Sequence, residues 1–409
     1  MGSGVRLDAP CEGQGGGLHC AAPIYPQALA ITTSAPPTTV LRKPAATPRV
    51  WLLEPYRTGE QQQVLALAEA LGWPFEIKHL HYRTLAFGTN LLRGSSLRGI
   101  DRRRSAALAA PWPDLVISAG MRNEPVGRWI RRQSGGRCRI VHVGRPWADP
   151  QRFDLVITTP QYRLPRRANV LHNDLPLHRV QAARLREAAA RWRDTLAQLP
   201  APRIAVILGG DSGPFTLGAK AARRLAEAAT ELARQRGGSL LTTTSPRTAD
   251  AVTRVFAGDL GVPTHFYAWQ PGAADNPYFG YLALADAFIV TADSVSMLAE
   301  ACATGKPLYL FDLGTGRHSM RAGCGGARAD VRADPDGNDF RLSGLLYRAL
   351  MRWGWQRLSR DITLIHRQLV ASGRAVWLGD PEPHWQGDTG GDVARAVARI
   401  RALFDSAAC

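Results

Sequence analysis

The sequence predicts an α/β protein made of two tandem doubly wound domains. Strand-like apolar runs alternate with helical stretches in both halves of the chain, and turns of small residues follow the strands. This order of elements is typical of a parallel sheet that is covered by helices. The length of 409 residues also exceeds a single core of ordinary size, so we expect two such units.

The first half of the chain supplies the first sheet. Val50–Leu53 is a short apolar run typical of a buried strand, and a helical stretch follows it and ends at Gly72. The same unit then recurs. Apolar runs predict further strands over residues 114–120, 139–143 and 153–157, and helical spacing predicts a helix over 125–132.

The pattern restarts in the second half. A long charged helix over 180–199 ends at Pro200 and Pro202, where we place the hinge between the domains. Beyond it we predict strands over 203–208, 239–244, 287–291 and 307–311, and helices over 217–236, 297–304 and 342–370, the last packing back across the first domain. The expected segments are a disordered leader (1–47), two Rossmann-like domains (48–200 and 201–341) and a C-terminal helical segment (342–409).

The composition limits the partners and the setting. A net charge of +17 favours phosphate-rich partners, of which we expect a nucleotide and the anionic leaflet of a membrane but not nucleic acid. The alternative is that the source organism has generally basic protein surfaces, which would give the same net charge. The six cysteines form no Cys-x-x-Cys pair, and neither a membrane span nor a secretory signal is visible. We therefore expect a cytoplasmic protein without a metal site, which meets a membrane only at its surface.

The first candidate site is a glycine loop at the start of the second domain. Gly209, Gly210, Asp211 and Ser212 follow a predicted strand and precede a predicted helix. Glycines let the backbone approach a ligand, and the free amides of a helix start favour an anion. The loop therefore predicts a phosphate site, although it is neither a Walker loop nor a GxGxxG motif. A tight turn without a ligand is the alternative.

The second candidate site follows the strand predicted at 287–291. Asp293 or Ser294 is placed to cap the next helix, and the hydroxyls of Ser294 and Ser296 are suited to hold a diphosphate. Glu300 lies further along that helix, where a carboxylate can accept hydrogen bonds from ribose hydroxyls. An exposed glutamate without a ligand is the alternative. The predicted nucleotide site at this position comprises Asp293, Ser294, Ser296, Met297 and Glu300.

Two strand–helix turns of the first domain are candidates for the acceptor side of a reaction. Such turns lie at the carboxyl edge of a parallel sheet, where ligands bind. In the first turn Glu60 is a candidate general base, with a plain helix-start glutamate as the alternative. The acceptor-side residues of the two turns are Gly59, Gln63, Gly120, Arg122 and Asn123.

Aromatic and basic clusters give two weaker signals. The aromatic residues over 267–271 and 276–281 suggest a shelf for a nucleobase, or else packed loop aromatics. Arginine clusters over 98–104, 128–139 and 163–167 suit docking on anionic lipid or an anionic acceptor, or else form solvated helix faces.

Val290–Met297, followed by Glu300–Ala301 and Thr304–Pro307, resembles a block found in the ELM1 family. That family is named for a plant mitochondrial fission factor and has many bacterial members; the Arg- and Ala-rich composition favours a bacterial one. The family usually has Asp-Gly in the first turn, where this chain has Pro55–Tyr56, and its second glycine loop varies, so Asp211–Gly213 do not transfer as ligands. Further matching stretches are Gly59 with Gln63 and Leu67–Leu71, Ile117–Gly120, Phe153–Ile157, Asn169–Val170 and Gly209–Gly210.

The ELM1 family is in turn similar to GT-B glycosyltransferases, such as the peptidoglycan enzyme that adds N-acetylglucosamine to a lipid-linked acceptor. The resemblance implies a nucleotide-sugar-dependent transferase that acts on a cell-envelope glycan or lipid, with Glu300 on the ribose. It also implies no cofactor and no metal, because helix-terminal amides stabilise the leaving diphosphate. Two other functions stay open: a non-catalytic adaptor at a membrane surface, and a sugar-nucleotide 2-epimerase.

Overall fold

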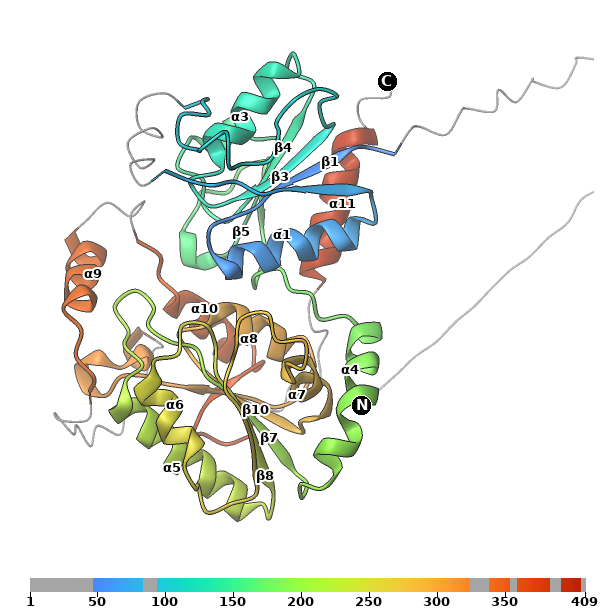
Figure 1. Ribbon diagram of the computed structural model, residues 1–409. Helices are drawn as coiled ribbons and strands as arrows, with labels where there is room; N and C mark the ends of the chain where they lie inside the picture. The colour runs from blue at the N-terminus through green and yellow to red at the C-terminus, as the bar shows by residue number, and fades with distance from the viewer. Residues whose placement is uncertain (1–46, 84–93, 324–337, 354–358, 383–390, 406–409) are drawn as a thin grey trace, which may run out of the picture. The chain divides into compact units, whose positions relative to one another are not determined.

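The computed structural model describes residues 47–83, 94–323, 338–353, 359–382 and 391–405 (Figure 1). The expected leader, apart from Thr47, lies outside the described residues. Within the described ranges, no helix combines the length and the apolar character that crossing a bilayer requires.

The N-terminal half forms a six-stranded sheet in which every neighbouring pair is parallel. Side chains that alternate along the first strand enter different cores: Val50 and Leu52 pack with the first helix, whereas Trp51 and Leu53 pack with the next one. The sheet is therefore covered on both faces. Its strands, in spatial order, are β2 (Phe75–Lys78), β1 (Val50–Leu53), β3 (Leu115–Ala119), β4 (Arg139–Val143), β5 (Leu155–Thr158) and β6 (Val170–His172), and helices α1 (Thr58–Leu71) and α3 (Glu124–Gln133) pack against it.

A second parallel sheet of six strands follows. Its strands, in spatial order, are β12 (Val376–Trp377), β11 (Leu308–Phe311), β10 (Ala287–Thr291), β7 (Arg203–Ile207), β8 (Ser239–Thr243) and β9 (Thr264–Tyr267). The helices of this half are α4 (Ala182–Ala197), α5 (Ala219–Gln235), α6 (Asp250–Ala257), α7 (Tyr278–Leu284), α8 (Val295–Cys302), α9 (Leu342–Trp353) and α10 (Thr363–Ala371). This topology confirms the predicted fold class, two tandem doubly wound sheets of the GT-B type.

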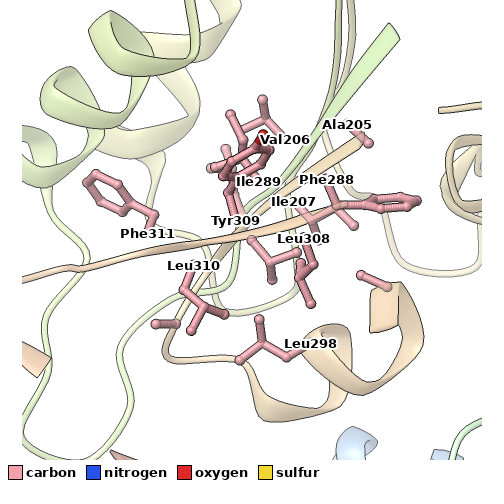
Figure 2. Packing of buried hydrophobic residues seen from close by; sticks show 14 of the residues in the cluster. Ala205, Val206, Ile207, Phe288, Ile289, Leu298, Leu308, Tyr309, Leu310 and Phe311 are labelled. Atoms are coloured by element: carbon pink, nitrogen blue, oxygen red, sulfur yellow. The ribbon is translucent and has the colours of Figure 1, made fainter. Parts of the chain in front are cut away.

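The central strands of the second sheet are mostly apolar, as is usual for strands buried on both faces. Figure 2 shows Val206 and Ile207 of β7 beside Phe288 and Ile289 of β10, with Leu298 of α8 turned toward the strands. These side chains are fully buried. This packing holds α8 against the sheet and places the amino end of the helix directly after β10.

The C-terminal residues complete both halves. Helix α10 packs into the second core through Ile365 and Leu369, and β12 adds an edge strand beside β11. Within the described C-terminal residues, α11 (Asp392–Asp405) joins the first core, through Ala396 and Ile400. The segment expected to pack across the first domain, 342–370, also contacts the first half: Arg163 pairs with Asp361, and the Asp361 amide donates to the Gln161 carbonyl at 3.0 Å.

Candidate functional site

Each sheet has a switch point, where the strand order reverses direction between two neighbouring strands. Ligands of α/β sheets bind beside such points. In the second sheet the switch point lies between β7 and β10. The turns that follow these strands carry the two predicted nucleotide-binding stretches. The fold therefore brings the glycine loop and the start of α8 to the same edge of the sheet.

The glycine loop uses its amides internally. The amide of Gly209 donates to Thr291 Oγ1 at 2.8 Å, and the amide of Gly210 donates to Asp293 Oδ2 at 2.9 Å. A Cβ atom on Gly210 would lie 2.1 Å from the carbonyl oxygen of Arg247, so this position requires glycine because another backbone approaches it. The sequence predicts that these amides hold a phosphate. In the structure they donate to Thr291 and Asp293, so they are not free.

Asp293 is a structural carboxylate of this loop. It is only 1% exposed, and Arg247 donates to its Oδ2 at 3.0 Å, while Oδ1 has no partner among the described residues. Burial raises the pKa of Asp293, against the opposing influence of Arg247. This buried carboxylate faces the Gly209–Gly210 backbone, and its role as a nucleotide ligand stays a prediction.

The amino end of α5 is also occupied. The carboxylate of Asp339 accepts the amides of Gly218 and Ala221, both at 3.0 Å. Asp211 accepts the amide of Leu217 at 3.0 Å and pairs with an arginine, and Ser212 accepts a hydrogen bond from another. The anion site that the glycine loop predicts is therefore filled by a carboxylate of the chain itself.

The amino end of α8, in contrast, remains open. The amides of Val295, Ser296 and Met297 find no acceptor within the described part of the chain, and neither do the hydroxyls of Ser294 and Ser296. The side chain of Met297 packs against the core. A helix start with unpaired amides and two hydroxyls is a site suited to an anion.

Glu300 shares a helix face with Ser296, because residues four apart in a helix are neighbours. Its Oε2 accepts a short hydrogen bond from the phenol of Tyr278. Its Oε1 has no partner in the residues that the structure describes. Burial raises the pKa of Glu300 to about 7, although Tyr278, Arg184 and Arg179 favour the ionised form. The carboxylate is thus held in a defined orientation with one oxygen available.

The raised pKa predicts a pH-dependent effect of Glu300→Gln on stability. A carboxyl whose folded pKa lies above its unfolded pKa favours folding below the unfolded value, and this contribution is lost as the pH rises through the folded value. For Glu300 the window runs from 4.5 to about 7. We expect Glu300→Gln to raise the melting temperature, relative to the parent protein, more at about pH 8 than at about pH 5. Equal differences at both pH values, measured by calorimetry, would contradict the raised pKa.

In the first sheet the switch point lies between β1 and β3, and the predicted acceptor-side turns follow these two strands. A Cβ atom on Gly120, which has a φ of +72°, would lie 2.6 Å from Glu60 Oε2, so the carboxylate rests against the Gly120 backbone. Burial raises the pKa of Glu60, against the influence of Arg57 and Arg360. Gln63 donates to the Gly59 carbonyl at 3.2 Å and closes the same turn.

Arg122 and Asn123, both predicted on the acceptor side, differ in what they contact. The guanidinium of Arg122 lies 4.6 Å from the ring centroid of Tyr56 and makes no ion pair with the described residues. Asn123 is buried and donates to the carbonyl of Leu53 at 2.9 Å. Arg122 therefore remains a candidate for an acceptor contact. Asn123 ties α3 to β1, and its acceptor-side role stays a prediction.

Two contacts connect the turns of the first sheet with the second half of the chain. A Cβ atom on Gly59 would lie 3.4 Å from Ser296 Oγ, so the start of α1 meets the start of α8. Arg360, whose charge acts on Glu60, donates to Ser212 Oγ at 2.9 Å. Glu60, Gly59, Gly120, Ser296 and Ser212, all predicted from the sequence, are thus brought into one neighbourhood.

Several residues of this neighbourhood were not predicted, or were predicted in another role. Arg247 follows β8, a neighbour of β7, and the rule that parallel strands end at one edge would have found it. Tyr278 belongs to the predicted aromatic shelf, but its hydroxyl binds Glu300, and Tyr281 is fully buried. Arg360 and Asp339 have no sequence signal, because they reach the loop from distant segments.

Three arginines from two of the three predicted basic clusters form ion pairs. Arg131 pairs with Asp154, Arg163 with Asp361 and Arg167 with Asp149. In the described chain no group of three or more His, Cys, Asp or Glu side chains is arranged to hold a metal ion. Metal independence stays a prediction.

Solved structures resemble this chain only loosely. A UDP-GlcNAc 2-epimerase from Neisseria meningitidis, solved with UDP-GlcNAc, aligns with a TM-score of 0.43 at 10% identity, over 87% of this chain and 100% of that one. WaaG, a glycosyltransferase involved in lipopolysaccharide biosynthesis, aligns with a TM-score of 0.40 at 13% identity, over 86% and 99%. Overlaps of this size say nothing about what this chain binds.

Sequence relatives are more informative. The mitochondrial fission protein ELM1 of Arabidopsis thaliana is 34% identical over 238 residues, 53% of this chain and 55% of that protein, so this chain spans just over half the length of that relative. The uncharacterized protein RP120 of Rickettsia prowazekii (strain Madrid E) is 24% identical over 293 residues, 64% of this chain and 82% of that protein. The model of the family described as mitochondrial fission ELM1 matches residues 58–325. The chain therefore belongs to the mitochondrial fission ELM1 family.

Proposed function

We propose that this protein binds a nucleoside-diphosphate sugar at the amino end of α8 and transfers the sugar to an acceptor. One observation carries the proposal: the unpaired amides and hydroxyls at Ser294–Met297 lie one helical turn from the oriented carboxylate of Glu300. The diphosphate would meet the amides, and the ribose would meet Glu300. The spacing of about 6 Å between residues four apart suits a nucleoside diphosphate.

The leaving diphosphate would be stabilised by fixed dipoles. Helix-start amides carry partial positive charge and need no reorganisation when the negative charge develops. The hydroxyls of Ser294 and Ser296 would add two donors. This chemistry requires no metal ion. We therefore propose that the protein works without a cofactor.

The acceptor would lie on the side of the first sheet. Glu60 is the proposed general base, because its raised pKa brings a carboxylate closer to the pH at which it would remove a proton. Arg122, stacked on the exposed ring of Tyr56, would hold a polar or anionic group of the acceptor. A cell-envelope glycan or lipid, met at an anionic cytoplasmic membrane surface, fits the net charge of +17.

An adaptor without catalysis is the second candidate function. The observation that favours it is the internal use of the Gly209 and Gly210 amides and the filling of the α5 start by Asp339. A third candidate, a sugar-nucleotide 2-epimerase, would need a histidine at the site. His142 is instead buried against Ser118, with Nδ1 at 3.0 Å from Oγ.

A screen of purified protein against UDP, GDP, CMP and their common sugars, by thermal shift and calorimetry, tests the proposal. We expect one nucleotide to bind in the range of about 1 to 100 μM, or roughly −8 to −5 kcal/mol. A folded protein that binds none of them would reject the transferase proposal and favour the adaptor.

Ser296→Asp is the sharpest variant for the binding site. An added carboxylate at the helix start would repel the diphosphate and lower nucleotide affinity by about tenfold to a hundredfold. The same charge interacts favourably with the helix dipole, so thermal stability should be unchanged or slightly higher. Ser296→Ala, which removes only the hydroxyl, should weaken binding by a few-fold at most. Equal affinities for Ser296→Asp and the parent protein, in calorimetry, would place the nucleotide elsewhere.

A further inference from the structure

Helix α9 has an exposed apolar stripe. Phe340, directly before the helix, is 76% exposed, and within it Leu342, Leu345, Leu346 and Trp353 are also exposed. The helical positions are spaced by three, four and seven residues, so they lie on one face. Among the described residues the exposed large apolar side chains otherwise include only Tyr56 and Phe75, both in the first half of the chain.

The opposite face of α9 is fastened to the candidate site. A Cβ atom on Gly213 would lie 3.1 Å from the ring of Tyr347, and Arg348 donates to the Pro214 carbonyl at 3.2 Å. The phenol of Tyr347 accepts the amide of Arg360 at 2.9 Å. These contacts fasten the inner face of α9 (Figure 1), while the side chains of the apolar stripe are exposed.

The charges around the stripe are basic. Helix α9 contains no Asp or Glu, and the nearby carboxylate of Asp339 is used by the amides of α5. Lys220 and Arg223 are exposed on the first turns of α5, which Asp339 holds beside the start of α9. An apolar helix face with an aromatic residue and a basic surround is typical of a helix that lies in the surface of an anionic membrane.

The size of the stripe argues against a second copy of the chain as its occupant. A helix of 12 residues is about 18 Å long, and a strip one helix wide offers roughly 200 Å². A stable dimer buries about 800 Å² on each partner. A membrane needs only that a few side chains enter the interface, because each buried apolar group contributes on its own.

We infer that the outer face of α9 docks on an anionic lipid surface. The inference deepens the proposed function, on which it rests for the membrane setting, and assigns the contact to Phe340, Leu342, Leu345, Leu346 and Trp353 rather than to the basic clusters of the first half. It also places the docking helix in direct contact with the loop at residues 211–216, beside the candidate site.

Flotation of the full-length protein with vesicles tests the inference. We expect binding to vesicles of phosphatidylcholine with phosphatidylglycerol, weaker binding at high salt and little binding to phosphatidylcholine alone. The double variant Leu345→Gln/Leu346→Gln should bind about tenfold less, or weaker still. Phe75→Gln, which removes an exposed ring from the first half, should bind like the parent protein. Each variant should melt at the parent temperature, because these side chains are exposed.

Three outcomes would overturn the inference. The first is that the parent protein does not bind anionic vesicles, and the second is that the double variant binds them as well as the parent does. The third is that the parent protein binds no vesicles but sediments as a dimer, and that the double variant sediments as a monomer. The nucleotide screen on the same preparations separates the two proposals. Nucleotide binding without vesicle binding would reject the docking surface alone, and vesicle binding without nucleotide binding would reject the transferase alone.

Discussion

Glu60→Gln is expected to slow sugar transfer by about 10²- to 10⁴-fold, the usual contribution of a general base. Glutamine keeps the shape of the side chain that rests against Gly120 but cannot accept a proton. Because the proposed phosphate donors are the amides and hydroxyls at the start of α8, and Glu60 is not one of them, nucleotide affinity should stay within about twofold, a difference of roughly 0.4 kcal/mol. The measurement is the release of nucleoside diphosphate from the nucleotide sugar that the screen identifies.

Glu231→Gln is the matched control for this experiment. Glu231 lies on α5 and pairs with Arg234 at the surface, far in sequence from both predicted turns. The control should retain the parent rate. A Glu60→Gln protein as active as the control would exclude Glu60 as the base, and a Glu60→Gln protein that no longer binds nucleotide would mean that Glu60 acts in binding.

Gly210→Ala is expected to destabilise the protein by about 3 kcal/mol or more. The new Cβ would lie 2.1 Å from the carbonyl oxygen of Arg247, a backbone atom that cannot rotate away as a side chain would. Relief requires the turn after β8 to move, which disturbs the Arg247–Asp293 pair and the Gly210 hydrogen bond. Urea denaturation of both proteins measures the loss.

Gly258→Ala serves as the control for Gly210→Ala. A Cβ atom on Gly258 meets nothing nearer than 3.7 Å, and its φ of −78° suits any residue. We expect its free energy of unfolding to stay within about 0.5 kcal/mol of the parent value. If both variants unfolded at the same urea concentration as the parent protein, the close approach of the glycine loop and Arg247 would be absent.

The sequence predicted the central strands of both sheets because these strands are buried on both faces and are mostly apolar. The edge strands escaped prediction for the opposite reason. Phe75–Lys78 and Thr264–Tyr267 are partly exposed and carry polar residues, and Val376–Trp377 is only two residues long. Such segments become strands because a neighbouring strand offers hydrogen-bond partners, which a single sequence does not reveal.

For the site, the sequence predicted which turns lie at the same edge of a sheet. It did not predict which side chains accept the amides of the glycine loop and of the start of α5. The turns at Glu60, Gly120, Gly209 and Ser294 follow central strands, so the parallel topology places them at the switch points. The occupants of the glycine loop come from elsewhere: Thr291 and Asp293 take its amides. Asp339 reaches the start of α5 across 121 residues. Contacts between such distant residues depend on tertiary packing, and no local pattern encodes them.

Hydrogen–deuterium exchange of the full-length protein, with and without saturating UDP, GDP or CDP, tests the central claim most directly. The account predicts that the nucleotide that binds will slow exchange at the amides of Val295, Ser296 and Met297, which have no acceptor in the described chain, while the amides of Gly209 and Gly210 change little. A nucleotide that binds tightly yet leaves the start of α8 unprotected would contradict the assignment of this helix as the diphosphate site.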